Sequence, residues 1–212
     1  MHSSQDALLN LWKKIFNQLH EASAYAELLS CSYLSRSKTH LDLKTAERNI
    51  ELQKRHIYFF RIMESGIAYA TVLSITKLFE SKERLSILNV INEAKKFKID
   101  VTADFESLGK NHGKTLKQLK TARDEFFAHR RKDLEKTNVP SRDDIFALLH
   151  AIAELLKKIG SSMSPGHGHT WDYENEGFAR DTRMSFQLMI ENLYRGEQAR
   201  LAEIEIEYSK KL

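Results

Sequence analysis

Apolar residues recur at intervals of three and four along most of the chain, which is the spacing of one face of an α-helix. The first such stretch runs from about Gln5 to Leu34, and a polar connection over residues 35–40 follows it. A second stretch covers residues 43–80, and its second half is apolar on nearly every side. Because a helix that is apolar all round packs against several neighbours, this stretch predicts a long central helix, with a bend at Ser65–Gly66.

Shorter helices are predicted beyond this stretch. Residues 81–97 keep one apolar face and predict a third helix. Residues 98–112 lack the pattern and are expected to be irregular. They lead to an amphipathic helix that begins near Lys114.

The C-terminal third contains the clearest boundaries. Ser141 followed by Asp144 is typical of a capping box, in which two side chains bind each other's backbone N–H groups at a helix start. The helix that starts there is expected to end at Gly160. Residues 161–168 read Ser-Ser-Met-Ser-Pro-Gly-His-Gly, which is a strong helix breaker, and a last helix begins near Asp181.

These elements predict an all-α fold, an up-and-down helical bundle. We expect the bundle over residues 1–160, a linker loop over 161–180, and an additional C-terminal helix over 181–212 that packs on the bundle or on a partner. His167 and His169 lie in the linker, but no Cys or closely spaced third ligand accompanies them. We therefore predict no metal site.

Composition places the chain among globular proteins. Of its 212 residues, 42% are hydrophobic and 29% are charged, which is sufficient for a folded core. The single cysteine, Cys31, forms no disulfide within the chain, and we expect it to be a small residue in a helix interface rather than a nucleophile. The N-terminus lacks a signal-peptide pattern, and no apolar run is long enough to span a membrane. We expect a cytoplasmic protein without membrane contact.

Positive charge is concentrated in one region. The formal net charge of +4 and the pI of about 9.0 are too mild to predict nucleic-acid binding by themselves. Residues 110–136, however, contain more basic than acidic side chains, and both a solvated helix face and a phosphate-binding surface fit that excess. The basic residues are Lys110, Lys114, Lys117, Lys120, Arg123, Arg130, Arg131, Lys132 and Lys136.

Arg123 occupies an unusual position in this region, because apolar side chains flank it on both sides of its helix. An ionised guanidinium on an apolar stripe needs a carboxylate, a set of carbonyls or an anionic ligand as its partner. Glu64, on the central helix, is one candidate partner. The flanking side chains are Leu116, Leu119, Phe126 and Phe127.

His129 follows on the same predicted helix, about 120° away from Arg123. On a straight helix the two side chains do not point at one spot. They converge if the helix ends or bends near Ala128, or if two copies meet across a symmetric dimer.

The pair Arg123-Asp124, followed by four residues and His129, resembles the Arg-x(4–6)-His signature of the HEPN superfamily. The order of helices before it resembles the abortive-infection U-type (AbiU-like) branch, over roughly residues 5–160. The resemblance implies a helical bundle of HEPN type and a homodimer in which two motifs form one composite cleft. It also implies metal-independent cleavage of RNA, with attack by the ribose 2′-hydroxyl on the adjacent phosphorus, in phage defence or in a toxin–antitoxin pair.

By this resemblance each motif residue has a role. His129 is the general acid or base, Arg123 stabilises the phosphorane, and Asp124 orients or polarises the site. Some HEPN toxins carry a tyrosine two residues after the motif histidine, which a partner nucleotidyltransferase modifies; here that position is Arg131. No cofactor is implied, and an antitoxin protein is a further expected partner. The side chains expected to hold the RNA backbone are Arg130, Arg131 and Lys132.

Three interpretations of the motif remain open. The first is a HEPN ribonuclease. The second is a HEPN-fold module that binds RNA, nucleotide or protein without cleavage, with Arg123 as a structural buried cation. The third is a structural helical dimer in which the spacing of Arg123 and His129 is accidental.

Overall fold

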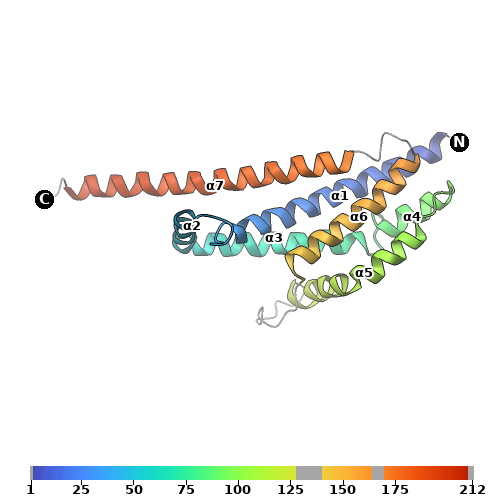
Figure 1. Cartoon of the computed structure of the whole chain (residues 1–212), viewed down its shortest axis with the longest axis horizontal. Coiled ribbons are helices and arrows are strands. Elements are labelled where there is room, and N and C mark those ends of the chain that lie inside the picture. The colour runs from blue at the N-terminus through green and yellow to red at the C-terminus, as the bar shows by residue number, and fades with distance from the viewer. Residues whose placement is uncertain (1, 128–139, 164–169, 210–212) are drawn as a thin grey trace.

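Seven α-helices and a π-helical segment make up the described part of the chain (Figure 1). This computed structural model describes residues 2–127, 140–163 and 170–209, and the side chains of residues 5–124, 140–163 and 177–209. No strand occurs in these ranges, which confirms the predicted all-α fold. The helices are α1 (His2–Leu34), α2 (Leu43–Arg55), α3 (Ile57–Leu78), α4 (Ile87–Lys95), α5 (Thr102–Thr121), η1 (Ala122–Phe127), α6 (Arg142–Met163) and α7 (Thr170–Ser209).

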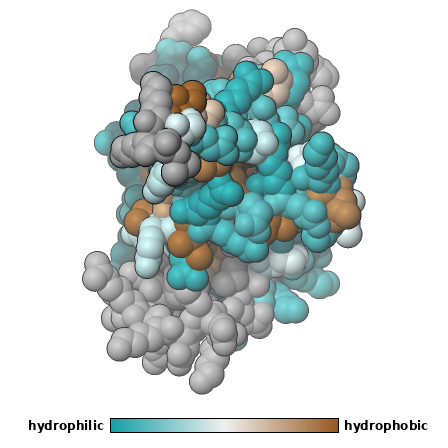
Figure 2. Space-filling view, turned by 90° about the vertical axis from the view of Figure 1, so that its left-hand side faces the viewer, coloured by the Kyte–Doolittle hydropathy of each residue, from teal (hydrophilic) through white to brown (hydrophobic). Residues whose placement is uncertain are grey.

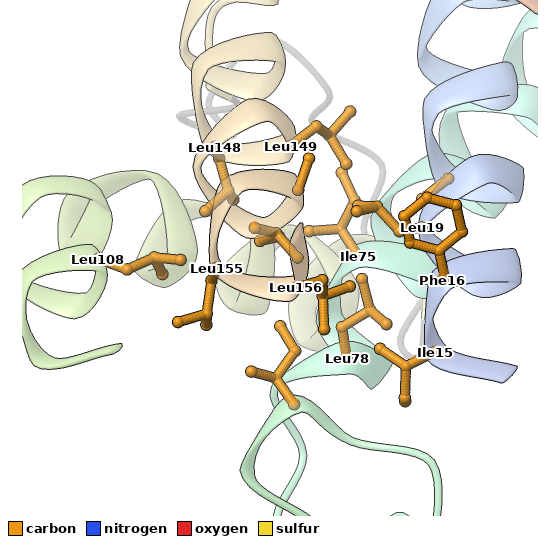
Figure 3. Close-up of a cluster of buried hydrophobic side chains, with 14 of the residues drawn as sticks. Ile15, Phe16, Leu19, Ile75, Leu78, Leu108, Leu148, Leu149, Leu155 and Leu156 are labelled. Carbon is orange, nitrogen blue, oxygen red and sulfur yellow. The ribbon is translucent and has the colours of Figure 1, made fainter. Parts of the chain in front are cut away.

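The main core lies where α1, α3, α5 and α6 meet, because the apolar stripe of each helix faces the others (Figure 3). One polar contact crosses this core: Trp12 Nε1 of α1 donates to the carbonyl oxygen of Leu156 in α6 at 2.8 Å. The buried indole N–H is thereby satisfied, which fixes the register of α1 against α6. The labelled core residues in Figure 3 are Ile15, Phe16, Leu19, Ile75, Leu78, Leu108, Leu148, Leu149, Leu155 and Leu156.

The long helix α7 packs on α1 and α2, and its C-terminal end projects beyond the bundle (Figure 1). Phe186 and Ile190 of α7 form a second, smaller core cluster with Leu52 of α2 and Phe60 of α3. The helix begins at Thr170 instead of near Asp181, so the second half of the predicted linker loop is helical. The division into bundle, linker and C-terminal helix as separate units stays a prediction.

The predicted single helix over residues 43–80 is wrong, because it is divided at His56. The expected bend at Ser65–Gly66 is also absent, since α3 is continuous there. Nor is α3 covered on every side. It exposes apolar side chains on one side, and brown patches interrupt the mainly hydrophilic surface at the end of the molecule where α2 joins α3 (Figure 2). The exposed side chains are Ile57, Tyr58, Phe59, Ile62 and Tyr69.

Three further helix boundaries differ from the prediction, and one is confirmed. The helix α4 begins at Ile87 instead of near residue 81, and α5 begins at Thr102, within the segment expected to be irregular. The helix α6 continues past Gly160 to Met163. The capping box at its start is confirmed: the Asp144 backbone N–H donates to Ser141 Oγ at 3.1 Å, and Ser141 N donates to Asp144 Oδ2 at 3.3 Å.

Candidate functional site

Arg123 and Asp124 lie in η1, where the backbone changes from α-helical to π-helical hydrogen bonding. The α-helical part ends at Thr121, and η1 covers Ala122–Phe127. A π-helical turn joins residues i and i+5 and accommodates an extra residue, and such turns are frequent at functional sites. The helix therefore changes geometry just before Ala128, near which an end or a bend would let Arg123 and His129 converge.

The apolar surroundings predicted for Arg123 are present in the described side chains. Leu119 is fully buried, Ala122 is buried, and Leu116 packs against the main core. The Arg123 side chain is 22% exposed, so most of it is removed from water.

Glu80 is the partner that the buried part of Arg123 requires. It follows Phe79, the C-terminal capping residue of α3, and its Oε1 forms an ion pair with Arg123 Nη1. The Glu80 side chain is 31% exposed. Partly buried ion pairs are screened less by salt than surface pairs, and this contact joins the end of α3 to η1.

Asp124 provides a second carboxylate for the same guanidinium. Its Oδ1 accepts from Arg123 Nε at 2.7 Å, and its side chain is 60% exposed. A guanidinium has five N–H donors in a fixed plane. Contacts at two of its nitrogens, Glu80 at Nη1 and Asp124 at Nε, therefore hold the orientation of that plane.

The prediction that Glu64 pairs with Arg123 is wrong. Its Oε1 accepts from Arg36 Nη2 at 2.7 Å and from Ser32 Oγ, so it is committed to the C-terminal end of α1. Sequence gave no signal for Glu80 in its place, because Glu80 lies beyond the periodic part of α3. The sequence was sufficient to predict that Arg123 needs a carboxylate. Which residue supplies it depends on the packing of α3 against η1.

The remaining predicted site residues lie outside the described residues. These are His129, the general acid or base, and the backbone-binding residues Arg130, Arg131 and Lys132. The structure therefore brings together Arg123 and Asp124 and adds Glu80, and it leaves the position of His129 as a prediction. His167 and His169 are likewise outside the described ranges.

Two general features bear on the class of site. Within the described ranges, no group of three or more His, Cys, Asp or Glu side chains is arranged to hold a metal ion. None of the described helices combines the length and apolar character needed to cross a bilayer.

The all-helical bundle, with Arg123 and Asp124 late in the chain, is consistent with a protein of HEPN type. A sequence model of the family described as AbiU2 (HEPN_AbiU2) matches residues 10–183, and the chain belongs to this family. The match extends beyond residue 160, where the resemblance was expected to end, and includes the first part of α7. Comparisons with curated proteins and with solved structures give no match.

Proposed function

We propose that this protein is a metal-independent endoribonuclease of HEPN type that acts in the cytoplasm, in phage defence or as a toxin. The observation that carries the proposal is the fixed plane of Arg123, which Glu80 holds at Nη1 and Asp124 holds at Nε. A guanidinium in this state offers a positive charge and parallel donors to phosphate oxygens.

In the proposed reaction the ribose 2′-hydroxyl attacks the adjacent phosphorus and the bond to the 5′-oxygen breaks. His129 accepts the 2′-hydroxyl proton, or donates a proton to the leaving 5′-oxygen. Arg123 stabilises the additional negative charge of the phosphorane. The products are a 2′,3′-cyclic phosphate and a 5′-hydroxyl, and dependence on the 2′-hydroxyl makes the reaction specific for RNA.

The proposal includes a homodimer that completes the cleft. The exposed stripe of α3 supports it, since Tyr58, Ile62 and Tyr69 recur at helical spacing on one side of the helix. Between them, Gly66 has open space around it, which allows close approach of a second surface. Ile62→Glu should yield monomers by size-exclusion chromatography with light scattering, whereas Lys44→Glu on α2 should not.

The test of catalysis is incubation of purified protein with labelled mixed RNA in EDTA. Wild type should produce fragments with 2′,3′-cyclic phosphate ends, and Arg123→Ala and His129→Ala should not. Arg195→Ala is the matched control, because Arg195 is a surface arginine 73% exposed and paired with Glu191 on α7. Cleavage that persists in Arg123→Ala and His129→Ala would point to a contaminant, and loss of cleavage in all three variants would point to a general loss of folding.

A second candidate function is a HEPN module that binds RNA, nucleotide or a protein such as an antitoxin without cleaving RNA. One observation favours it: two carboxylates already balance the charge of Arg123, as expected of a structural cation. In that case wild type shows no cleavage in EDTA but binds RNA or nucleotide, and the affinity falls as the salt concentration rises.

A further inference from the structure

The outward face of α5 carries a row of lysines that leads to Arg123. Lys110, Lys114, Lys117 and Lys120 follow each other at intervals of four, three and three residues, and all are exposed. At about 1.5 Å per residue the row extends over about 15 Å along the helix axis. The buried side of the same helix, with Leu108, Thr115 and Leu119, faces the core instead.

The charge of this row is only partly balanced within the described residues. The Lys114 ammonium helps to lower the pKa of Asp144 on α6, so part of its charge is balanced. Lys110, Lys117 and Lys120 have no carboxylate at ion-pair distance among the described side chains. Several lysines elsewhere do have one: Lys38 with Glu47, Lys54 with Glu51, Lys96 with Glu93 and Lys158 with Asp104.

Two glycines lie within this stretch of α5 without a packing reason. A Cβ at Gly109 or at Gly113 would meet nothing within 4 Å. Each glycine in a helix interior costs about 1 kcal/mol relative to alanine, so neither is explained by crowding within the chain. A helix surface without side chains at these positions lets a ligand backbone approach closely.

We propose that the outward face of α5 binds the phosphate backbone of a single-stranded RNA and leads the strand to Arg123. This inference rests on the proposed function, because it takes RNA as the ligand of the Arg123 site. Lys110, Lys117 and Lys120 bind successive phosphates as point charges, and the open space at Gly109 and Gly113 accommodates the sugar backbone. Glu106 and Asp124, both exposed acids of α5 and η1, limit the two ends of the row.

The test compares two double charge reversals that change the net charge equally. Lys110→Glu/Lys117→Glu changes the row, and Lys13→Glu/Lys14→Glu changes two exposed lysines of α1. Each is combined with His129→Ala to prevent cleavage, and binding of a labelled, unstructured RNA is measured by fluorescence anisotropy in increasing KCl. The row variant should lower the salt slope of log K by about two and the affinity near 0.1 M salt by at least about tenfold. The α1 variant should keep the slope of the His129→Ala parent, and both should keep its helicity and Tm.

The outcomes separate this inference from the proposed function. Equal loss of affinity in both variants, or no loss in the row variant, overturns the α5 surface. With His129 intact, Lys110→Glu/Lys117→Glu should raise the KM of RNA cleavage and leave kcat near that of wild type. If wild type binds RNA through the row in a salt-dependent manner but does not cleave it, the proposed nuclease activity is overturned. The proposed RNA-binding surface on α5 is then kept. Cleavage by wild type, together with unchanged RNA binding by the row variant, overturns the α5 surface and keeps the proposed nuclease.

Discussion

Glu80 and Arg123 join the end of α3 to the π-helical segment that follows α5, although they are far apart in the sequence. The contact lies between two elements that no local pattern relates. Asp124 holds the same guanidinium from within η1. The orientation of Arg123 therefore depends on two carboxylates: Asp124 within η1, and Glu80 just beyond the end of α3.

Glu80→Gln tests whether this contact positions Arg123 for reaction. The amide keeps a hydrogen-bond acceptor but removes the charge, so we expect a loss of about 1 kcal/mol of stability at most, because both side chains are partly exposed. Cleavage at saturating RNA should fall by about tenfold or more, with a smaller effect on KM, if a misplaced Arg123 stabilises the phosphorane less well. Glu93→Gln, which removes an exposed pair with Lys96, serves as control. An unchanged kcat would show that Glu80 has only a structural role.

Sequence periodicity predicted those features that depend on one helix alone. The extent of α1, the capping box of α6 and the need of Arg123 for a carboxylate all follow from neighbouring residues. The break at His56 could not be found in this way, because it accompanies a contact with α7: His56 Nε2 lies 2.9 Å from Glu197 Oε1. The early start of α5 was missed because residues 98–112 lack a clear apolar pattern. Packing of α5 on α3 and α6 outweighs the low helix propensity of Gly109 and Gly113.

Gly113→Ala should stabilise the protein. The added methyl group meets nothing within 4 Å, and alanine is favoured over glycine in a helix interior by about 1 kcal/mol. Chemical denaturation should show an increase of about 0.5–1 kcal/mol in the free energy of unfolding, with no change in the denaturant dependence. A decrease would mean that the helix is locally distorted at this position.

The capping box of α6 should make stability depend on pH in the acid range. The Ser141 hydroxyl donates to Asp144 at 2.6 Å and, against a small opposing effect of burial, lowers the pKa of that carboxyl below its usual 3.8. The Ser141 N–H, Lys114 and His112 act in the same direction. Because the pKa is lower in the folded state, the stabilisation is fully present above the usual value and is lost as the pH falls through the folded value.

Ser141→Ala measures this effect. It should lower the free energy of unfolding at pH 7 by about 1 kcal/mol, as is typical for loss of an N-terminal cap. The difference between variant and wild type should be smaller at pH 3 than at pH 7, because the stabilisation is lost progressively as the pH falls below 3.8, the usual pKa of the carboxyl. Urea denaturation at both pH values provides the comparison, and a difference that grows in acid would contradict the assignment.

Cys31 should react slowly with thiol reagents in the folded protein. Burial, reinforced by the Glu27 carboxylate and opposed by Arg183 and Arg142, raises the pKa of its thiol to about 11. The thiolate is the reactive form, so reaction with a disulfide reagent at pH 7 should be slow and should accelerate as the pH approaches 11. The side chain also lines a cavity of about 560 Å³ between α1, α2 and α7. Rapid labelling at pH 7 without denaturant would mean that this region opens readily.

Glu27 and Arg183 form the contact that we expect to matter most for the attachment of α7. Glu27 lies on α1 and is only 5% exposed, and its Oε1 accepts from Arg183 Nη1 at 2.8 Å. Removal of the arginine leaves a buried carboxylate without this partner, which is more costly than loss of the pair itself. Arg183→Met should therefore lower the free energy of unfolding by about 1–3 kcal/mol, the lower part of the range reflecting the exposure of Arg183.

A double-mutant cycle separates these two costs. Glu27→Gln combined with Arg183→Met removes the charge that the single variant leaves unpaired, so the double variant should be more stable than Arg183→Met alone. Arg195→Met, which breaks a surface pair with Glu191 on the same helix, should cost less than about 0.5 kcal/mol. Equal effects of Arg183→Met and Arg195→Met would show that Glu27 is hydrated, and that α7 is held by Phe186 and Ile190 instead of by this ion pair.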